Sequence, residues 1–286
     1  MHQINRYCTF TGMMKMAVTD LDGTLLNGNQ QVSNDDFNTL VELGSQGVIR
    51  VIATGRSPFS FQRVMAADFP IDYLVFSSGA GIMDYKTREI LYSMNLPETI
   101  VHAIAKTLRN LGVPFKVLAP VPGNHHYVYY RNGELHPDFV RRMETYRGYE
   151  KPISFDPPNF GEACQFLIIL PPDPARYEEL SSLFKGVKVI RATSPLDHRS
   201  IWMEIYHQDV SKGNAVDYLC NLYQINRSEV MGIGNDYNDT DLLGFVGQPF
   251  VVANSPEELK GLYKTVGSND ESGFSEAVRL SWQSSE

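Results

Sequence analysis

The stretch Met16-Ala17-Val18-Thr19-Asp20-Leu21-Asp22-Gly23-Thr24 decides the interpretation of this chain. A short apolar run stops at two acidic residues and a glycine, which is typical of a buried strand that ends in a loop. Asp20 and Asp22 are two residues apart, so on an extended chain their carboxylates point to the same face. Like charges this close repel each other unless a cation or protons intervene. The stretch therefore predicts a polar site at the end of a buried strand.

Helix and strand patterns alternate on either side of the middle of the chain. Ser33 is a suitable cap for a helix whose apolar face would be formed by Phe37, Leu40 and Val41. Further helix patterns cover 59–67 and 211–223, and strand patterns cover 48–53, 73–76, 230–233 and 250–253. Strands that alternate with helices predict an α/β fold with a doubly wound parallel sheet.

The middle of the chain follows a different pattern. From about Asp84, short strand patterns surround a hairpin at 86–88, and an amphipathic helix is expected at 97–111. The simplest organisation is one α/β domain, formed by residues 1–83 and 208–286, that is split by an inserted α+β domain at 84–207. Recognisable structure begins only at Lys15, so residues 1–14 are predicted to be a flexible extension, and Met1, Met13 and Met14 are all possible starts.

Composition excludes several classes of protein. The 286 residues carry a formal net charge of −8 and are 43% hydrophobic, which argues against disorder and against non-specific binding to nucleic acid or acidic membranes. The longest apolar runs, such as 166–170, are far shorter than the roughly 20 residues that span a bilayer. No secretion signal is apparent, and Cys8, Cys164 and Cys220 are far apart, so we expect a cytoplasmic protein with buried thiols.

Three more polar loops complete the expected site. They are Thr54-Gly55-Arg56, Ser211-Lys212-Gly213 and the segment 234–239, Gly-Asn-Asp-Tyr-Asn-Asp. Loops at the carboxyl ends of parallel strands share one edge of the sheet, which brings distant segments together. A small-residue turn suits an anion, Lys212 at a helix start needs an anion nearby, and the last loop offers the oxygen ligands that magnesium prefers. Together these groups predict phosphoryl transfer.

Within that chemistry, Asp20 is the candidate nucleophile, because a carboxylate that is ionised at neutral pH can form an acyl phosphate without a base. Asp22 would protonate the leaving oxygen and later deprotonate the attacking water. Mg²⁺ would bridge Asp20 and the phosphate, and Lys212 would add a positive charge to the same oxygens.

These four motifs, in this order and with an insertion between the second and the third, resemble those of the haloacid dehalogenase-like (HAD) hydrolases. More narrowly, they are similar to the Cof-type sugar-phosphate phosphatases. The resemblance covers nearly the whole chain from Lys15 and includes Ser78-Gly79-Ala80. It implies a Rossmann-like core, a cap from about Asp84 to His207, and magnesium dependence.

The resemblance also implies roles by position. Asp20 and Asp22 would be catalytic. Phosphate would be bound by Leu21, Thr54, Gly55, Lys212 and Asn238; metal would be bound by Asp20, Asp22 through its carbonyl, Asn235, Asp236 and Asp239; and Arg56 and Ser78 would lie on the substrate side.

One position departs from the family pattern. Asn235 stands where the family usually has a metal-binding aspartate. An asparagine oxygen can coordinate a cation but brings no charge, so metal affinity should fall unless a neighbour compensates. We favour Asn235 as a neutral ligand with Asp236 and Asp239 nearby; the alternative is a site shifted onto Asp236.

The resulting hypothesis is a magnesium-dependent phosphatase that acts on a small phosphorylated metabolite, preferably a sugar phosphate, through a phospho-Asp20 intermediate. One alternative is a phosphomutase on the same scaffold. Another is a non-catalytic sugar-phosphate sensor, which is motivated by Asn235. The substrate, the cap residues that contact it and the oligomeric state stay open.

Overall fold

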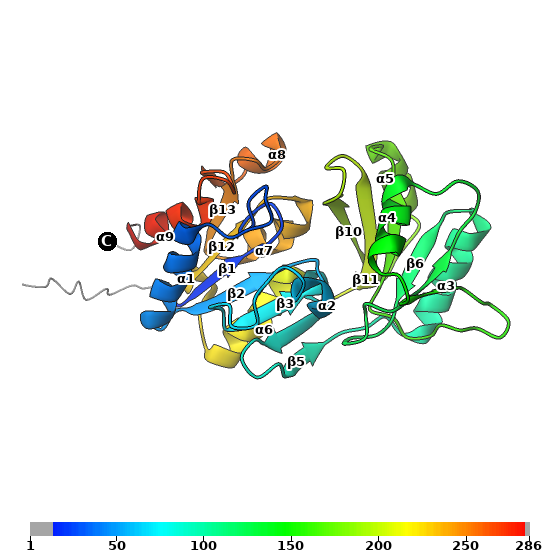
Figure 1. Cartoon of the computed structure of the whole chain (residues 1–286), viewed down its shortest axis with the longest axis horizontal. Helices are drawn as coiled ribbons and strands as arrows, with labels where there is room; N and C mark the ends of the chain where they lie inside the picture. The colour runs from blue at the N-terminus through cyan, green and yellow to red at the C-terminus, as the bar shows by residue number, and fades with distance from the viewer. Residues whose placement is uncertain (1–13, 284–286) are drawn as a thin grey trace, which may run out of the picture.

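A computed structural model describes residues 14–283, which form two β-sheets with their own helices, seen side by side in Figure 1. The predicted extension at the N-terminus, with Met1, Met13 and Cys8, lies outside the described residues apart from Met14, which is buried. None of the described helices has the length and apolar character needed to cross a membrane. Cys164 and Cys220 are free and buried, as expected.

The first sheet has eight strands. Their order across the sheet is β14 (Lys264–Val266), β13 (Gln248–Val252), β12 (Val230–Gly234), β1 (Met16–Thr19), β2 (Ile49–Ala53), β3 (Tyr73–Phe76), β4 (Gly81–Asp84) and β5 (Ile90–Ser93). All neighbours from β14 to β3 pair in parallel, whereas β4 and β5 are antiparallel. The chain runs outward from β1 in both directions, so the switch in strand order lies at β1. The predicted doubly wound α/β core is confirmed.

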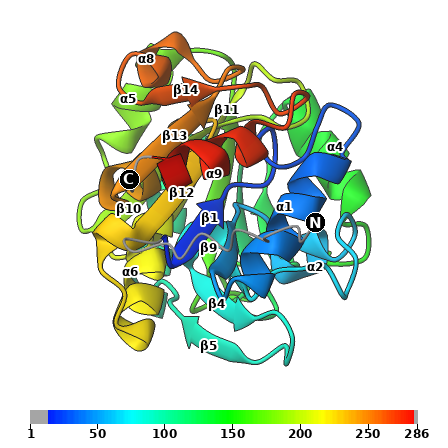
Figure 2. The ribbon, with the colours of Figure 1, turned by 90° about the vertical axis from the view of Figure 1, so that its left-hand side faces the viewer.

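Helices cover both faces of this sheet, as Figure 2 shows. Ala17 of β1 packs with α1 (Asn34–Ser45) and α9 (Gly273–Gln283), whereas Met16 and Val18 pack with α6 (Lys212–Tyr223) and α7 (Thr240–Phe245). This split follows from the alternation of side chains along a strand. The two apolar layers hold β1 rigidly at the centre of the core.

The predicted apolar face of α1 is wrong in part. Ser33 does cap the helix, but Phe37 and Val41 are exposed, and the buried face consists of Asp36, Leu40 and Leu43. Asp36 is buried because its carboxylate accepts hydrogen bonds from the Ser33 hydroxyl and from the main chain and hydroxyl of Ser275 in α9. A long-range polar contact therefore rotated the helix away from its most apolar stripe.

The second sheet has six strands in the order β10 (Val187–Thr193), β11 (Ile201–His207), β9 (Gln165–Leu170), β6 (Phe115–Leu118), β7 (Tyr127–Tyr130) and β8 (Glu150–Pro152). Only β7 and β8 pair in parallel. Apolar residues of α3 (Glu98–Asn110) and α5 (Pro174–Ser181) pack on one face. The opposite face packs against Phe139 of α4 (Pro137–Thr145), Tyr146 and, from the first unit, Phe59. This unit is α+β.

The structure differs from the sequence interpretation at several boundaries. The hairpin of β4 and β5 belongs to the first sheet, so the chain leaves that sheet after Ser93 rather than at residue 84. The helix expected at 59–67 is a single turn, α2 (Pro58–Phe61), followed by turns. The elements α4, β8, β14, α9 and α8 (Glu257–Lys260) were not anticipated, nor was the turn η2 (Arg227–Glu229). The turns η1 (Ser77–Gly79) and η3 (Tyr237–Asp239) lie within segments that the sequence predicts to be loops.

Candidate active site

The polar loops converge at the carboxyl ends of β1, β2, β3 and β12, where glycines allow them to touch. A Cβ at Gly23, whose φ is +77°, would lie 2.5 Å from a terminal atom of the Asn235 side-chain amide. A Cβ at Gly79 would lie 2.2 Å from the carbonyl oxygen of Ser211. Lys212 starts α6, and the strand before it, β11, belongs to the second sheet, so this loop comes from a helix start and not from a strand of the core. The predicted loops are thus brought together.

Asp20 lies at the centre of a buried ionic cluster. Lys212 Nζ donates to Asp20 Oδ1 at 2.7 Å and to Asp239 Oδ1 at 2.6 Å, and the lysine side chain is fully buried. Thr24 Oγ1 donates to the other oxygen, Asp20 Oδ2, at 3.1 Å. One ammonium therefore faces two carboxylates, and it holds Asp20 in one orientation.

Burial sets the protonation of this cluster. It raises the pKa of Asp20 to about 7, against the opposing attraction of Lys212. Burial also opposes the charge of Lys212, but the carboxylates of Asp20 and Asp239 outweigh it and raise the pKa of the lysine. Lys212 is thus held in its charged form, whereas burial opposes the ionised form of Asp20 and Lys212 favours it.

Asp22 is held by Arg56 in a two-pronged ion pair. Arg56 Nε donates to Asp22 Oδ2 at 2.7 Å, and Nη2 donates to Oδ1 at 2.6 Å. The guanidinium also donates to Gln30 Oε1 at 3.0 Å. Burial opposes the charge of Arg56, but Asp22 outweighs it and raises the pKa of the arginine. Arg56, expected on the substrate side, therefore has Asp22 as its main partner.

The Asn235 side chain occupies a cradle of oxygen atoms. The surrounding acceptors assign the amide nitrogen to the atom that faces them, and this atom lies 3.2 Å from each of Thr24 Oγ1, Asp20 Oδ2 and the main-chain oxygen of Asp22. A half-turn of the amide would present its oxygen instead. The chain thus offers one carboxylate, one carbonyl and one amide oxygen around a common point, a donor set of the kind that fits Mg²⁺.

Asp236 and Asp239, predicted as further metal ligands, have other partners. Asp236 accepts hydrogen bonds from the main chain and the hydroxyl of Thr193 in β10, at 2.6 and 3.0 Å. Asp239 uses one oxygen for Lys212 and the other for the main-chain N–H groups of Asn235 and Asp236. No cluster of three or more His, Cys, Asp or Glu side chains suited to a metal occurs within residues 14–283. The positions of the two side chains therefore favour Asn235 over Asp236 as the residue that could hold a metal ion.

The predicted phosphate-binding residues occupy different places in the site. Thr54 is buried, and its hydroxyl accepts a hydrogen bond from the main chain of Arg56. A Cβ at Gly55 would lie 3.6 Å from Ser78 Oγ and 4.0 Å from Asn238 Nδ2, so three loops meet at this glycine. The side chain of Leu21 is buried in the core, which leaves only its main chain for a ligand.

A buried polar cluster of the second sheet reaches this point and was missed by the sequence analysis. Ser78 Oγ donates to Glu204 Oε2 at 3.3 Å, and Gln165 and Tyr206 also donate to Glu204. Burial raises the pKa of Glu204, although Arg142 and these donors lower it. The sequence contains a signal that could have identified Glu204, because it is an isolated charge inside an otherwise apolar strand pattern, Ile-Trp-Met-Glu-Ile-Tyr, at 201–206.

The turn that carries Ser78 has an unusual backbone. Ser77, Ser78 and Gly79 have φ values of +49°, +56° and +101°. Residues other than glycine rarely adopt this left-handed backbone region. Backbone strain of this kind is often found at functional sites. Ser77 Oγ also accepts a hydrogen bond from Asn124 Nδ2 of the second unit at 2.7 Å. The turn therefore links the core to the polar face of the second sheet.

Comparisons with known proteins identify the family of the chain. Residues 17–278 match the family of haloacid dehalogenase-like hydrolases. A candidate phosphatase of Streptococcus pyogenes is 26% identical over 93% of this chain and 97% of its own length. The HMP-PP phosphatase of Yersinia pseudotuberculosis is 23% identical over 87% of each chain.

Solved structures share the fold. A phosphatase of the haloalkanoate (HAD) enzyme superfamily from Bacteroides thetaiotaomicron superposes with a TM-score of 0.78 at 18% identity, over 98% of this chain and 99% of its own. A HAD subclass IIB sugar phosphatase has a TM-score of 0.74 at 18% identity, over 93% and 98%. Because the family match spans most of the chain and includes all four polar loops, the protein belongs to the haloacid dehalogenase-like hydrolases and is a phosphatase-type enzyme of that family.

Proposed function

We propose that this enzyme is a magnesium-dependent phosphatase of small phosphorylated metabolites, with sugar phosphates as the preferred class, and that it works through a phospho-Asp20 intermediate. The observation that carries the proposal is the environment of Asp20. Its carboxylate is oriented by Lys212 and Thr24, and it borders the oxygen cradle around Asn235.

In the first step an Asp20 oxygen attacks the phosphorus atom, and the bond from phosphorus to the ester oxygen of the substrate breaks. The leaving oxygen takes a proton from Asp22, which has bound this proton from solvent after separating from Arg56. In the second step Asp22 takes a proton from water, the resulting hydroxide attacks the phosphorus of the acyl phosphate, and inorganic phosphate leaves with Asp20 restored. Lys212 stabilises the negative charge of the transferring group.

The ion pair between Asp22 and Arg56 must break before Asp22 can transfer a proton. The ion pair occupies both of its oxygens, at 2.7 and 2.6 Å from the guanidinium. A phosphate dianion that enters beside Arg56 competes for the same donors, since guanidinium binds phosphate as well as carboxylate. We therefore propose that substrate binding frees Asp22, which couples the proton transfer to the arrival of phosphate.

Magnesium would be held by Asp20, the carbonyl of Asp22 and the Asn235 amide. When bound, it supplies positive charge that neutralises the phosphate and favours the ionised form of Asp20. Only one of these three groups is a carboxylate, so water and substrate oxygens would complete the set of ligands.

The second unit is the cap in this proposal. Its polar face contacts the core through Glu204 with Ser78, Asn124 with Ser77, and Thr193 with Asp236. A cap that covers the phosphate loops excludes water and contacts the rest of the substrate. The proposal of a sugar phosphate is supported by the fold likeness to a sugar phosphatase and by the polar residues of this face.

The test is phosphate release from a panel of sugar phosphates, nucleotides and cofactor phosphates, with magnesium and with a chelator. Asp20→Asn should abolish release, whereas the control Asp68→Asn, which alters an exposed carboxylate away from the loops, should retain it. Transfer of phosphate within the substrate without release would favour the phosphomutase. Tight binding without turnover at saturating magnesium would favour the sensor.

A further inference from the structure

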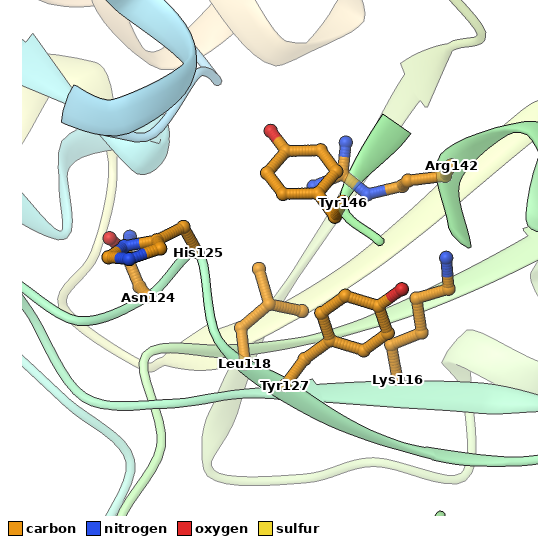
Figure 3. A pocket seen from close by; sticks show the side chains of 7 residues that line it. All are labelled: Lys116, Leu118, Asn124, His125, Tyr127, Arg142 and Tyr146. Carbon is orange, nitrogen blue, oxygen red and sulfur yellow. The ribbon is translucent and has the colours of Figure 1, made fainter. Parts of the chain in front are cut away.

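The cap contains a narrow pocket that the proposed chemistry does not use. It is lined by Lys116, Leu118, Asn124, His125, Tyr127, Arg142 and Tyr146, which in this conformation leave no room for a water molecule. One end of a ligand can enter it only when some of these side chains move apart. Figure 3 shows Lys116 and Arg142 on one side of the pocket, and Asn124 and His125 on the other.

Two cations line the pocket without an acidic partner. Lys116 is fully buried in β6, and its Nζ has one hydrogen bond, to the carbonyl of Phe139 at 3.2 Å. It lies over the rings of Phe139 and Tyr127, and Arg142 lies over the rings of Tyr146 and Trp202. Among residues 14–283 neither cation forms an ion pair. Glu150 and Glu204 influence them only at longer range.

The pocket also contains polar atoms that lack partners. Asn124 Oδ1, His125 Nδ1 and Tyr127 Oη are buried and have no hydrogen-bond partner among the described residues. Asn124 is 1% exposed and Tyr127 is 6% exposed. Buried polar groups are normally paired, so an unpaired set at one place indicates a missing ligand or water. Here the hydroxyl of Tyr127 lies on the side of the cations, and an acceptor, Asn124 Oδ1, lies across the pocket (Figure 3).

The pocket adjoins the candidate active site. Asn124 donates to Ser77 of the strained turn at 2.7 Å. Tyr146 lies beside Ser57 and Ser60, and Arg56 Nη1 donates to Ser60 Oγ at 3.4 Å. The ring of Phe59, from the core, stacks on His125 with centroids 4.6 Å apart. The pocket therefore lies next to the loops on which the phosphate of a substrate is proposed to bind.

We propose that Lys116 and Arg142 form an anion-binding subsite in the cap, so that the preferred substrates carry a second anionic group, a carboxylate or a second phosphate, besides the phosphate that is hydrolysed. The inference rests on the proposed function. A buried ammonium with one hydrogen bond costs stability, and apolar side chains of similar size would pack as well between the two rings. Burial lowers the pKa of Lys116, and an anion in the pocket opposes this effect by stabilising the charged form of the lysine. Tyr127 adds a hydrogen-bond donor.

The test compares pairs of substrates that differ in the second anion. Glucose 6-phosphate with 6-phosphogluconate tests a carboxylate, and fructose 6-phosphate with fructose 1,6-bisphosphate tests a second phosphate. In at least one pair, kcat/KM of the wild type should be at least tenfold higher for the doubly anionic member. Lys116→Met and Arg142→Gln should each lower this ratio at least tenfold, mainly through KM. Lys106→Met, which removes an exposed cap cation on α3, should leave the ratio unchanged.

Equal kcat/KM within both pairs would overturn the inference while leaving the phosphatase intact, as would an equal fall in the ratio with Lys106→Met. If no substrate is turned over, the proposed function fails, and calorimetry on Asp20→Asn tests the subsite by itself. There the doubly anionic member of one pair should bind at least tenfold tighter, and the added Lys116→Met should remove the difference. Equal binding of both members would refute the subsite.

Discussion

The substitution Lys116→Met tests whether the buried lysine of the second unit lowers the stability of the protein. Replacement by Met keeps a side chain of similar length between the rings of Phe139 and Tyr127 but removes a buried amine. Burial, with a smaller effect from Arg142 and an opposing one from Glu150, lowers the pKa of Lys116 from its ordinary 10.5 to about 6. We therefore expect Lys116→Met to stabilise the protein.

The magnitude follows from the two pKa values. Between about pH 6 and 10.5 the unfolded chain binds a proton that the folded chain does not, so the free energy of unfolding rises with pH in this window. Each pH unit is worth about 1.4 kcal/mol, so at pH 7 the amine costs on the order of 5 kcal/mol. The substitution also removes the hydrogen bond to Phe139, which lowers the expected gain in stability by about 1 kcal/mol. With local relaxation, the expected gain is about 3 kcal/mol at pH 7, falling towards zero near pH 10.

Urea unfolding between pH 6 and 10 measures this difference. Trp202 lies in the apolar cluster beside the pocket, so its fluorescence reports on the cap, and a Trp282→Phe background removes the other tryptophan. Lys106→Met is the matched control and should have no such pH dependence. A difference between Lys116→Met and wild type that is zero, or that does not change with pH, would show that the folded protein holds Lys116 charged and compensated, and would refute the reasoning.

Three other perturbations follow from the core. Lys212→Met leaves two buried carboxylates without their counter-charge, so it should abolish turnover. In urea unfolding it should also lower the free energy of unfolding by about 3–5 kcal/mol. An unchanged urea midpoint of unfolding would contradict the buried ionic cluster. Asn235→Asp adds a carboxylate to the oxygen cradle and should tighten Mg²⁺ binding at least tenfold by calorimetry, with Asp68→Asn as the control; an equal or weaker affinity would mean that this side chain is not a ligand. Asp236→Ala removes both hydrogen bonds to Thr193 and should open the cap, seen as a larger radius of gyration in solution scattering and a raised KM; an unchanged radius and KM would show that this contact does not hold the cap.

Local sequence was enough to predict β1, β2, β3, β12 and β13 of the core sheet and the order of the polar loops, but not β14 or the place of β4 and β5 in that sheet. A buried strand such as 16–19 is a run of neighbouring apolar residues, and its end is marked by the acidic pair that follows. The convergence of the loops that carry Asp20, Thr54 and Asn235 was also within reach, because parallel strands bring their carboxyl ends to one edge. Lys212 reaches Asp20 by another route, since its helix follows a strand of the second sheet.

Only the tertiary structure decided which partner each polar side chain has. Asp22 pairs with Arg56, Asp236 turns to Thr193 of the cap, and Ser78 meets Glu204, in each case across a long stretch of chain. Periodicity cannot predict these contacts, because it describes which face of an element is apolar but not what lies opposite that face.

The same reason explains the errors within the elements. The buried face of α1 was set by Asp36 and its partner Ser275 on another helix, which outweighed the apolar stripe. Lys116 and Glu204 each look like a single interruption of an apolar strand, and their common position on the polar face of the cap appears only when β6 and β11 are joined through β9 in one sheet. The polar residues at the edge of the core sheet can thus be recognised in local sequence, whereas those of the second unit are brought together only by long-range strand pairing.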